Sequence, residues 1–240
     1  MNIWCPEKRH ACGNGPAISL LALIISFLLF YGPGTAGATG LARSGPVRAG
    51  LAAKIQAAYG RIRDASGSFV QQSCLKDLGK TETFGGHFMI KLPGKMRYIY
   101  NKGSRDQVII RGNVITIYQK NEAQVLKSWF NPGTYGTAPV AFLGGLGNIG
   151  RDFFVSEKNG KLVLTPKNKN RMSGVTSITV TPSNGAFPIR SFSIRDRYEN
   201  TVRITLKDVK LNRGIKNSVF EFTPPHGTHV FDYTQPQTGD

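Results

Sequence analysis

The sequence predicts a mainly β protein whose strands are antiparallel and form a sandwich or a barrel. Three observations lead to this prediction. Short segments alternate apolar and polar residues with a period of two, turn signals separate these segments, and hardly any helical pattern interrupts them. Hydrophobic residues make up 40% of the 240 residues, which is enough apolar material for a sizeable core.

The first residues have the pattern of a secretory signal peptide. Lys8 and Arg9 precede the apolar run Ile18–Tyr31, and Ala36–Ala38 fits the site of cleavage. A transmembrane anchor is the alternative, but it needs about 20 apolar residues, and this run is shorter. The sequence therefore predicts export with cleavage near Ala38, and a single domain over residues 39–240.

An amphipathic helix is expected at the start of the mature chain. Between Val47 and Ile62, apolar residues recur at helical spacing and basic residues occupy the remaining arc. Packing of this helix against a sheet is the favoured interpretation, and binding to a membrane surface is the alternative.

The segment Phe84–Tyr100 predicts two strands joined by a turn at Pro93-Gly94, because this pair supplies a fixed φ followed by a permissive one. Each strand has an apolar face, since Phe88 and Ile90 share one parity in the first strand and Met96 and Tyr98 share one in the second. We expect about eleven strands in all. The others are predicted at Ser68–Leu75, Asp106–Ile110, Val114–Gln119, Gln124–Phe130, Asp152–Glu157, Lys161–Thr165, Gly174–Thr181, Ile189–Asp196, Thr201–Val209 and Phe220–Phe222.

One segment, Ala138–Leu146, is apolar and rich in glycine. Pro139 suits a first helical turn, and the glycines from Gly144 onward loosen its end. A short helical lid and a hydrophobic plug are equally compatible with this pattern.

No motif for catalysis, metal binding or cofactor binding is found. Gly145–Gly150 matches G-x-G-x-x-G but lacks the strand, helix and acidic residue that dinucleotide binding needs. The cysteines and histidines have no metal-ligand spacing, and the Ser, His and Asp residues form no recognisable triad. We therefore expect no catalytic residue, no metal and no cofactor.

The net charge of +17 suits nucleic acid, an anionic membrane surface or an acidic partner protein. A basic cluster from Lys95 to Arg111 is interleaved with Tyr98 and Tyr100, as in proteins that bind single-stranded nucleic acid. However, alternation places Arg97 on the strand face opposite Tyr98. A groove of cooperating cations and aromatic rings is therefore not expected.

What remains is hydrophobic surface. A curved sheet with one apolar face either packs without a ligand or encloses an acyl chain. Burial is worth about 0.8 kcal/mol per CH₂, so a chain of roughly 15 carbons gains about 12 kcal/mol. A carrier that shields such a chain makes its transit through water feasible.

Five features span nearly all of the mature chain: the initial helix, the strand pair GGHFMIKLPGKMRYIY, the segment APVAFLGGL, GKLVLTPK at Gly160–Lys167, and FEFTPPHGTHVFD at Phe220–Asp232. In these features the sequence resembles the LolA family of periplasmic outer-membrane lipoprotein carriers. This resemblance implies an unclosed β-barrel with a helical lid over an apolar cavity. Such a carrier receives the acyl chains of lipoproteins from an inner-membrane ABC transporter and passes them to an outer-membrane receptor, without bond chemistry. The alternatives are an envelope-stress sensor of the same fold, a polyanion-binding protein and a secreted hydrolase.

The resemblance also implies roles for individual residues. The lid is expected at Pro139, Phe142, Leu143 and Leu146. Two positions depart from the family pattern. Leu92 stands where the family often has an arginine that hydrogen-bonds to the lid, and Met96 stands where an aromatic residue is frequent, at a place used in cargo transfer. The residues expected to line the acyl cavity are Phe69, Phe88, Ile90, Tyr98, Ile115, Ile117, Phe192 and Ile194.

Overall fold

The computed structural model describes residues 50–130, 143, 149–168 and 174–235. The predicted signal peptide and its cleavage site lie outside these residues. The described helices are α2 (Leu51–Tyr59), α4 (Ile149–Asp152) and the 3-10 helix η5 (Asn217–Phe220). The strands are β1 (Asp64–Leu75), β2 (Lys80–Lys91), β3 (Lys95–Lys102), β4 (Gln107–Arg111), β5 (Val114–Gln119), β6 (Gln124–Trp129), β7 (Phe153–Lys158), β8 (Lys161–Pro166), β9 (Val175–Pro182), β10 (Ile189–Asp196), β11 (Thr201–Leu211) and β12 (His229–Asp232).

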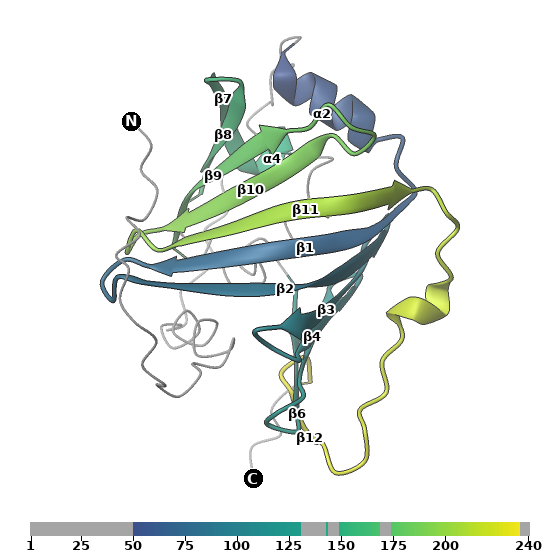
Figure 1. The fold of residues 1–240 in the computed structure, drawn as a ribbon. Coiled ribbons are helices and arrows are strands. Elements are labelled where there is room, and N and C mark those ends of the chain that lie inside the picture. The colour runs from purple at the N-terminus through teal and green to yellow at the C-terminus, as the bar shows by residue number, and fades with distance from the viewer. Residues whose placement is uncertain (1–49, 131–142, 144–148, 169–173, 236–240) are drawn as a thin grey trace.

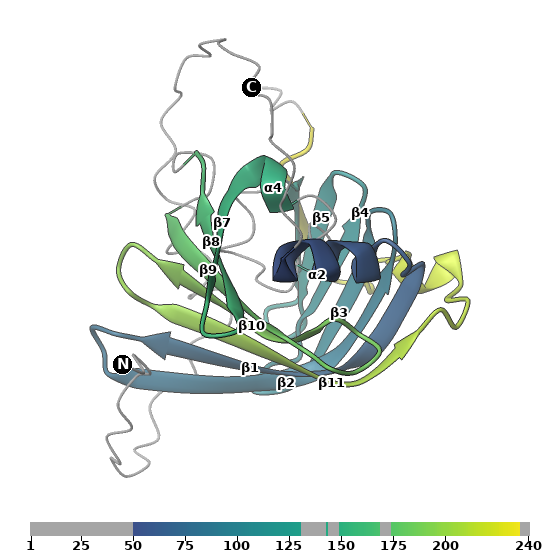
Figure 2. The same ribbon diagram turned by 90° about the horizontal axis from the view of Figure 1, so that it is seen from above.

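All twelve described strands belong to one sheet, in the order β12-β6-β5-β4-β3-β2-β1-β11-β10-β9-β8-β7. Neighbouring strands are antiparallel except for β12, which runs parallel to β6. The sheet is strongly curved, and α2 lies across its concave face (Figures 1 and 2). Because β7 and β12 are the two edges of the described sheet, the predicted unclosed antiparallel barrel is confirmed.

Strand β1 joins the two halves of the sheet. It pairs with β2 on one side, as a hairpin, and with β11 on the other side, with Phe69 opposite Leu206. The β1–β11 ladder shifts register between Ser66 and Ser68, which marks a bulge. Among the described strands, β1–β6 and β7–β11 thus form two successive meanders whose backbones pair through β1 and β11.

Most predicted strands are confirmed, with ends that differ by at most four residues, but Phe220–Phe222 is not a strand. The chain forms η5 there, and the Phe220 side chain is completely buried. The last strand, β12, comes later, at His229–Asp232. The helix predicted from Val47 to Ile62 is also shorter than expected, since α2 ends at Tyr59 and residues 47–49 lie outside the described residues.

The chain leaves the sheet after β11 and crosses its convex face as a segment that we call the C-terminal strap, residues 212–228 (Figure 1). Its first turn is held by the carboxylate of Asp64, which accepts the backbone N–H groups of Arg213 at 2.7 Å and Gly214 at 3.0 Å. Nearby, Lys91 Nζ donates to the carbonyl of Ile215 at 2.7 Å. These bonds fix the point where the strap turns away from the sheet.

The middle of the strap packs on β3, β4 and β5. Arg97 Nη1 donates to the carbonyl of Val219 at 2.8 Å, next to the buried Phe220 ring. Farther along, the ring of Phe222 lies 5.2 Å from that of Tyr118, between centroids. The strap therefore gives the convex face a small apolar cluster of its own, and it ends in β12 at the edge of the sheet.

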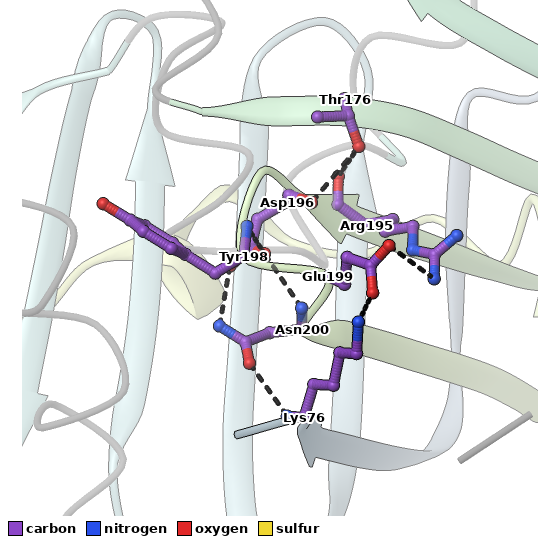
Figure 3. A network of polar contacts seen from close by, with 7 residues as sticks. All are labelled: Lys76, Thr176, Arg195, Asp196, Tyr198, Glu199 and Asn200. Carbon is purple, nitrogen blue, oxygen red and sulfur yellow. Dashed lines mark hydrogen bonds and ion pairs between the residues drawn. The ribbon is translucent and has the colours of Figure 1, made fainter. Parts of the chain in front are cut away.

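Polar side chains connect two turns at the other end of the sheet, where Figure 3 shows them. The Asp196 carboxylate accepts the backbone N–H groups of Tyr198 at 2.8 Å and Asn200 at 2.9 Å. Asn200 Oδ1 then accepts the backbone N–H of Lys76 at 3.1 Å, and Lys76 forms an ion pair with Glu199. The β10–β11 turn is thereby tied to the β1–β2 turn.

Gly86 is required by the close approach of β2 and β3. A Cβ atom at this position would overlap the backbone carbonyl of Ile99, whereas a Cβ at Gly85 would lie 3.4 Å from its nearest neighbour, the carbonyl oxygen of Phe69. The register of the two strands shifts between these glycines. Both residues are buried, so they form a matched pair.

We expect Gly86→Ala to lower the free energy of unfolding by about 1–3 kcal/mol, because the strands must separate to admit the methyl group. Gly85→Ala should change it far less, because its Cβ meets only ordinary contacts. Urea unfolding of both variants tests this, and equal losses would show that close approach at Gly86 is not the cause.

Candidate functional site

The concave face of the sheet carries the candidate site. All eight residues predicted to line a cavity are buried and belong to one cluster, to which β1, β2, β3, β5 and β10 contribute. The sequence left open which strand parity faces inward, and the structure places this apolar parity on the concave side, toward α2. Binding of an acyl chain by these residues stays a prediction.

Aromatic rings fill the centre of the concave face. Phe69 on β1 meets Tyr100 edge-on at a centroid distance of 5.1 Å and Tyr98 at 6.2 Å. Phe88 on β2 stacks on Tyr98 at 6.4 Å, and Phe84 meets Tyr100 edge-on at the same distance. Such pairs contribute about 0.5–1.5 kcal/mol each beyond the area that they bury. These contacts fix the orientations of the aromatic rings in this part of the concave face.

Helix α2 covers the concave face with one side. Ala52, Ile55 and Tyr59 are its buried residues, and their spacing of three and four is that of one helical stripe. The helix also contacts the loop between β9 and β10, because the ring of Tyr59 meets that of Phe187 edge-on at a centroid distance of 5.9 Å. The prediction that this helix packs against a sheet is confirmed.

One residue of the predicted lid is described. Leu143 is completely buried, and its backbone carbonyl accepts a hydrogen bond from the hydroxyl group of Tyr59. The other predicted lid residues, Pro139, Phe142 and Leu146, lie outside the described residues. Sequence reasoning missed the role of Tyr59; its one signal is a hydroxyl group within the apolar stripe of the helix.

Leu92 and Met96 flank the β2–β3 turn and lie differently. Met96 is buried in the concave cluster. Leu92 is only partly buried, packs against the cluster, and donates its backbone N–H to the carbonyl of Arg63 at 2.8 Å. Their predicted roles in contact with the lid and in transfer of cargo stay predictions.

Burial controls the ionisation of the tyrosines on this face. It raises the pKa of the Tyr59, Tyr98 and Tyr100 phenols above their ordinary value of about 10. All three are therefore neutral at physiological pH. The Tyr59 hydroxyl keeps the proton that it donates to Leu143.

Arg97, a member of the basic cluster that suggested a polyanion site, does not cooperate with the tyrosines of its strand. Tyr98 and Tyr100 are buried on the concave face, while Arg97 lies on the other face and bonds to Val219 and to Gln107 Oε1 at 2.7 Å. The aromatic rings and this cation are therefore on opposite sides of the sheet, as alternation predicted.

The described part of the chain also bears on metal binding and on membrane insertion. Among these residues there is no group of three or more His, Cys, Asp or Glu side chains able to hold a metal ion. Within the same ranges, none of the helices is long and apolar enough to cross a membrane.

The family model and the sequence relatives that match this chain name the same family. The family model described as outer membrane lipoprotein carrier protein LolA matches residues 61–223. The outer-membrane lipoprotein carrier protein of Bordetella avium (strain 197N) is 28% identical over 181 residues, which cover 74% of this chain and 85% of that protein. The protein of the same name from Ralstonia nicotianae (strain ATCC BAA-1114 / GMI1000) is 27% identical over 197 residues, covering 78% and 89%. A crystal structure of a LolA superfamily protein from Nitrosomonas europaea has a TM-score of 0.43 and 11% identity, and it covers 71% of this chain and 97% of that chain.

The Tyr59–Leu143 hydrogen bond gives a prediction. Tyr59→Phe keeps the ring that packs on Phe187 but leaves the buried Leu143 carbonyl without this donor, so we expect the free energy of unfolding to fall by about 1–3 kcal/mol. Tyr198→Phe, at a tyrosine that is 53% exposed, is the matched control and should have little effect. Urea unfolding measures both, and the same stability for the two variants would contradict the role given to Tyr59.

Proposed function

This chain belongs to the family of outer membrane lipoprotein carrier proteins, LolA, and on that premise we propose that it holds the acyl chains of lipoproteins on its concave face. Binding is non-covalent, and no bond of the cargo is made or broken. The protein is thus a carrier and not an enzyme.

The observation that carries this proposal is the continuous apolar wall of the concave face. Its members come from most strands of the sheet, and α2 and Leu143 lie against it. Among the described residues, α2 and Leu143 lie against this wide curved face, and displacing a few of their side chains would open apolar surface to a ligand. Each CH₂ group placed there gains about 0.8 kcal/mol, which accounts for retention of a long acyl chain in water.

The proposed route has three parts. Residues 1–38 direct export and are removed near Ala38, so the carrier acts in the periplasm. An inner-membrane ABC transporter that releases lipoproteins loads it, and an outer-membrane receptor lipoprotein unloads it. The carrier acts as a monomer, and the excess of basic over acidic residues that remains after removal of residues 1–38 assists its approach to acidic docking surfaces.

Mass spectrometry of the protein purified from the periplasm tests the proposal. We expect the first residue to follow Ala38 and lipoproteins or their acyl species to co-purify. Residues 39–240 expressed without the signal peptide, and therefore retained in the cytoplasm, are the matched control and should carry no lipoprotein. Protein that is exported, correctly folded and free of acyl species would contradict the carrier function.

Leu92 gives a second test. We propose that this carrier keeps its lid closed by apolar contact at Leu92, where many relatives use an arginine. Leu92→Arg should restore the polar contact and slow hydrogen exchange across residues 139–146, whereas Leu92→Met keeps an apolar side chain and should leave it unchanged. Equal exchange in the two variants and the parent would refute this role.

A further inference from the structure

The convex side of β9, β10 and β11 differs in composition from the concave side of the same strands. Ile178, Phe192 and Ile204 point inward, because they belong to the concave cluster. The side chains that alternate with such residues in the paired parts of these strands therefore project to the convex side. All of them carry a hydroxyl group or a positive charge: Ser177, Thr179, Thr181, Ser191, Ser193, Arg195, Thr201, Arg203 and Thr205.

Three cations follow one another along the convex side of β11, and we call Arg203, Lys207 and Lys210 the basic row. Arg203 and Lys207 have the outward parity of the strand, and Lys210 returns to it beyond the bulge, opposite Ser66. At about 3.3 Å per residue, neighbours in the row lie roughly 10–13 Å apart. Lys207 and Lys210 are exposed, and no ion pair in the described part of the chain involves a member of the row.

Two carboxylates lie near the basic row, and both have partners. Asp208 follows Lys207 at the bulge and accepts a hydrogen bond from Ser68 Oγ at 3.4 Å. Glu199, in the β10–β11 turn, forms an ion pair with Lys76. The three cations of the row exceed the adjacent Asp208 by two charges, so this strand keeps an electropositive convex side.

The curvature of the sheet places the basic row where a flat surface would first touch the protein. Figure 2 shows β1, β2 and β11 at the base of the curved sheet, on the side away from α2. A convex surface meets a plane along its most protruding line, and the row follows one of the strands there. The middle of the C-terminal strap packs on β3, β4 and β5, to one side of this line.

The chemistry of this side favours lipid head groups over an acidic protein. Stable protein interfaces form around buried aromatic or aliphatic side chains. Of the large hydrophobic side chains that are exposed in the described part of the chain, none belongs to β9, β10 or β11. Phosphate oxygens, in contrast, accept hydrogen bonds from hydroxyl, guanidinium and ammonium groups, which are the groups present here.

We propose that the basic row docks the protein on an anionic phospholipid surface, with its convex side toward the head groups. The contact is electrostatic and inserts no side chain into the bilayer. This inference goes beyond the proposed acyl binding, because docking leaves the concave face directed away from the membrane. The carrier therefore holds or exchanges its cargo while it stays on the membrane surface, and either property can be lost without the other.

Sedimentation of the exported, mature protein with vesicles tests the proposal. One set of vesicles contains equal parts of phosphatidylglycerol and phosphatidylcholine, and the other contains phosphatidylcholine alone. At an ionic strength of about 0.1 M, we expect binding to the anionic vesicles only. Binding should disappear at about 1 M, because the Debye length falls from about 10 Å to about 3 Å.

Two triple variants locate the contact. Arg203→Gln/Lys207→Gln/Lys210→Gln should bind the anionic vesicles about 100-fold more weakly, because each cation near such a surface is worth about fivefold in affinity. The control Lys54→Gln/Lys102→Gln/Lys120→Gln removes the same charge at three exposed lysines away from β11, and it should lose less than about threefold. Both variants should bind a fluorescent fatty acid as the parent does, which shows that they are folded.

Each adverse result has a distinct meaning. Equal binding of the parent to the two kinds of vesicle overturns the proposal, because the contact would then be apolar. Equal weakening in the two triple variants overturns it as well, because net charge alone would be responsible. Tighter binding to polyglutamate than to vesicles at the same concentration of anionic groups would assign the basic row to an acidic protein instead. A parent protein that binds the fatty acid but no vesicle overturns docking alone, whereas failure to bind the fatty acid contradicts the carrier function.

Discussion

The burial of one apolar sheet face is the constraint on which the rest of the structure depends. Alternation gives nearly every strand an inward apolar side, and the curvature of the sheet gathers these sides into one concave wall (Figure 2). Helix α2 is amphipathic because it must cover that wall. On the convex face, polar contacts of Asp64, Lys91 and Arg97 hold the C-terminal strap, together with the small apolar cluster around Phe220.

The inward faces of the strands and the turns between them were predictable, because both depend on residues that are close in the sequence. A period of two assigns each side chain of a strand to one face, so the burial of Phe88, Ile90 and Tyr98 follows from the sequence. The turn at Pro93-Gly94 was equally local, and the strands on either side are confirmed. The unclosed form of the sheet could not be predicted from local sequence patterns. It came from the resemblance to a family, since nothing in one strand shows which strands remain at the edges.

The errors and omissions have a common cause in contacts between distant parts of the chain. Phe220–Phe222 has the composition of a strand, but Phe220 finds its partners on the convex face and no ladder is formed. The bond from Tyr59 to Leu143 and the bonds from Arg213 and Gly214 to Asp64 likewise join segments that the sequence separates. Periodicity predicts the face on which a polar group lies, but it does not show which group receives its hydrogen bond.

The pairing of β1 with β11 has a consequence for how the protein is made. β1 is the first of the described strands and β11 is nearly the last, so one edge of β1 has no partner until almost the whole domain has been synthesised. During that interval the β1–β6 meander exposes an unpaired strand next to a large apolar surface, a combination that favours association with other chains. Pairing across so long a separation is also slow, because loop closure precedes any gain from the new contacts. The incomplete chain therefore exposes the same apolar surface that the folded carrier uses for its cargo, and it must be kept from aggregating.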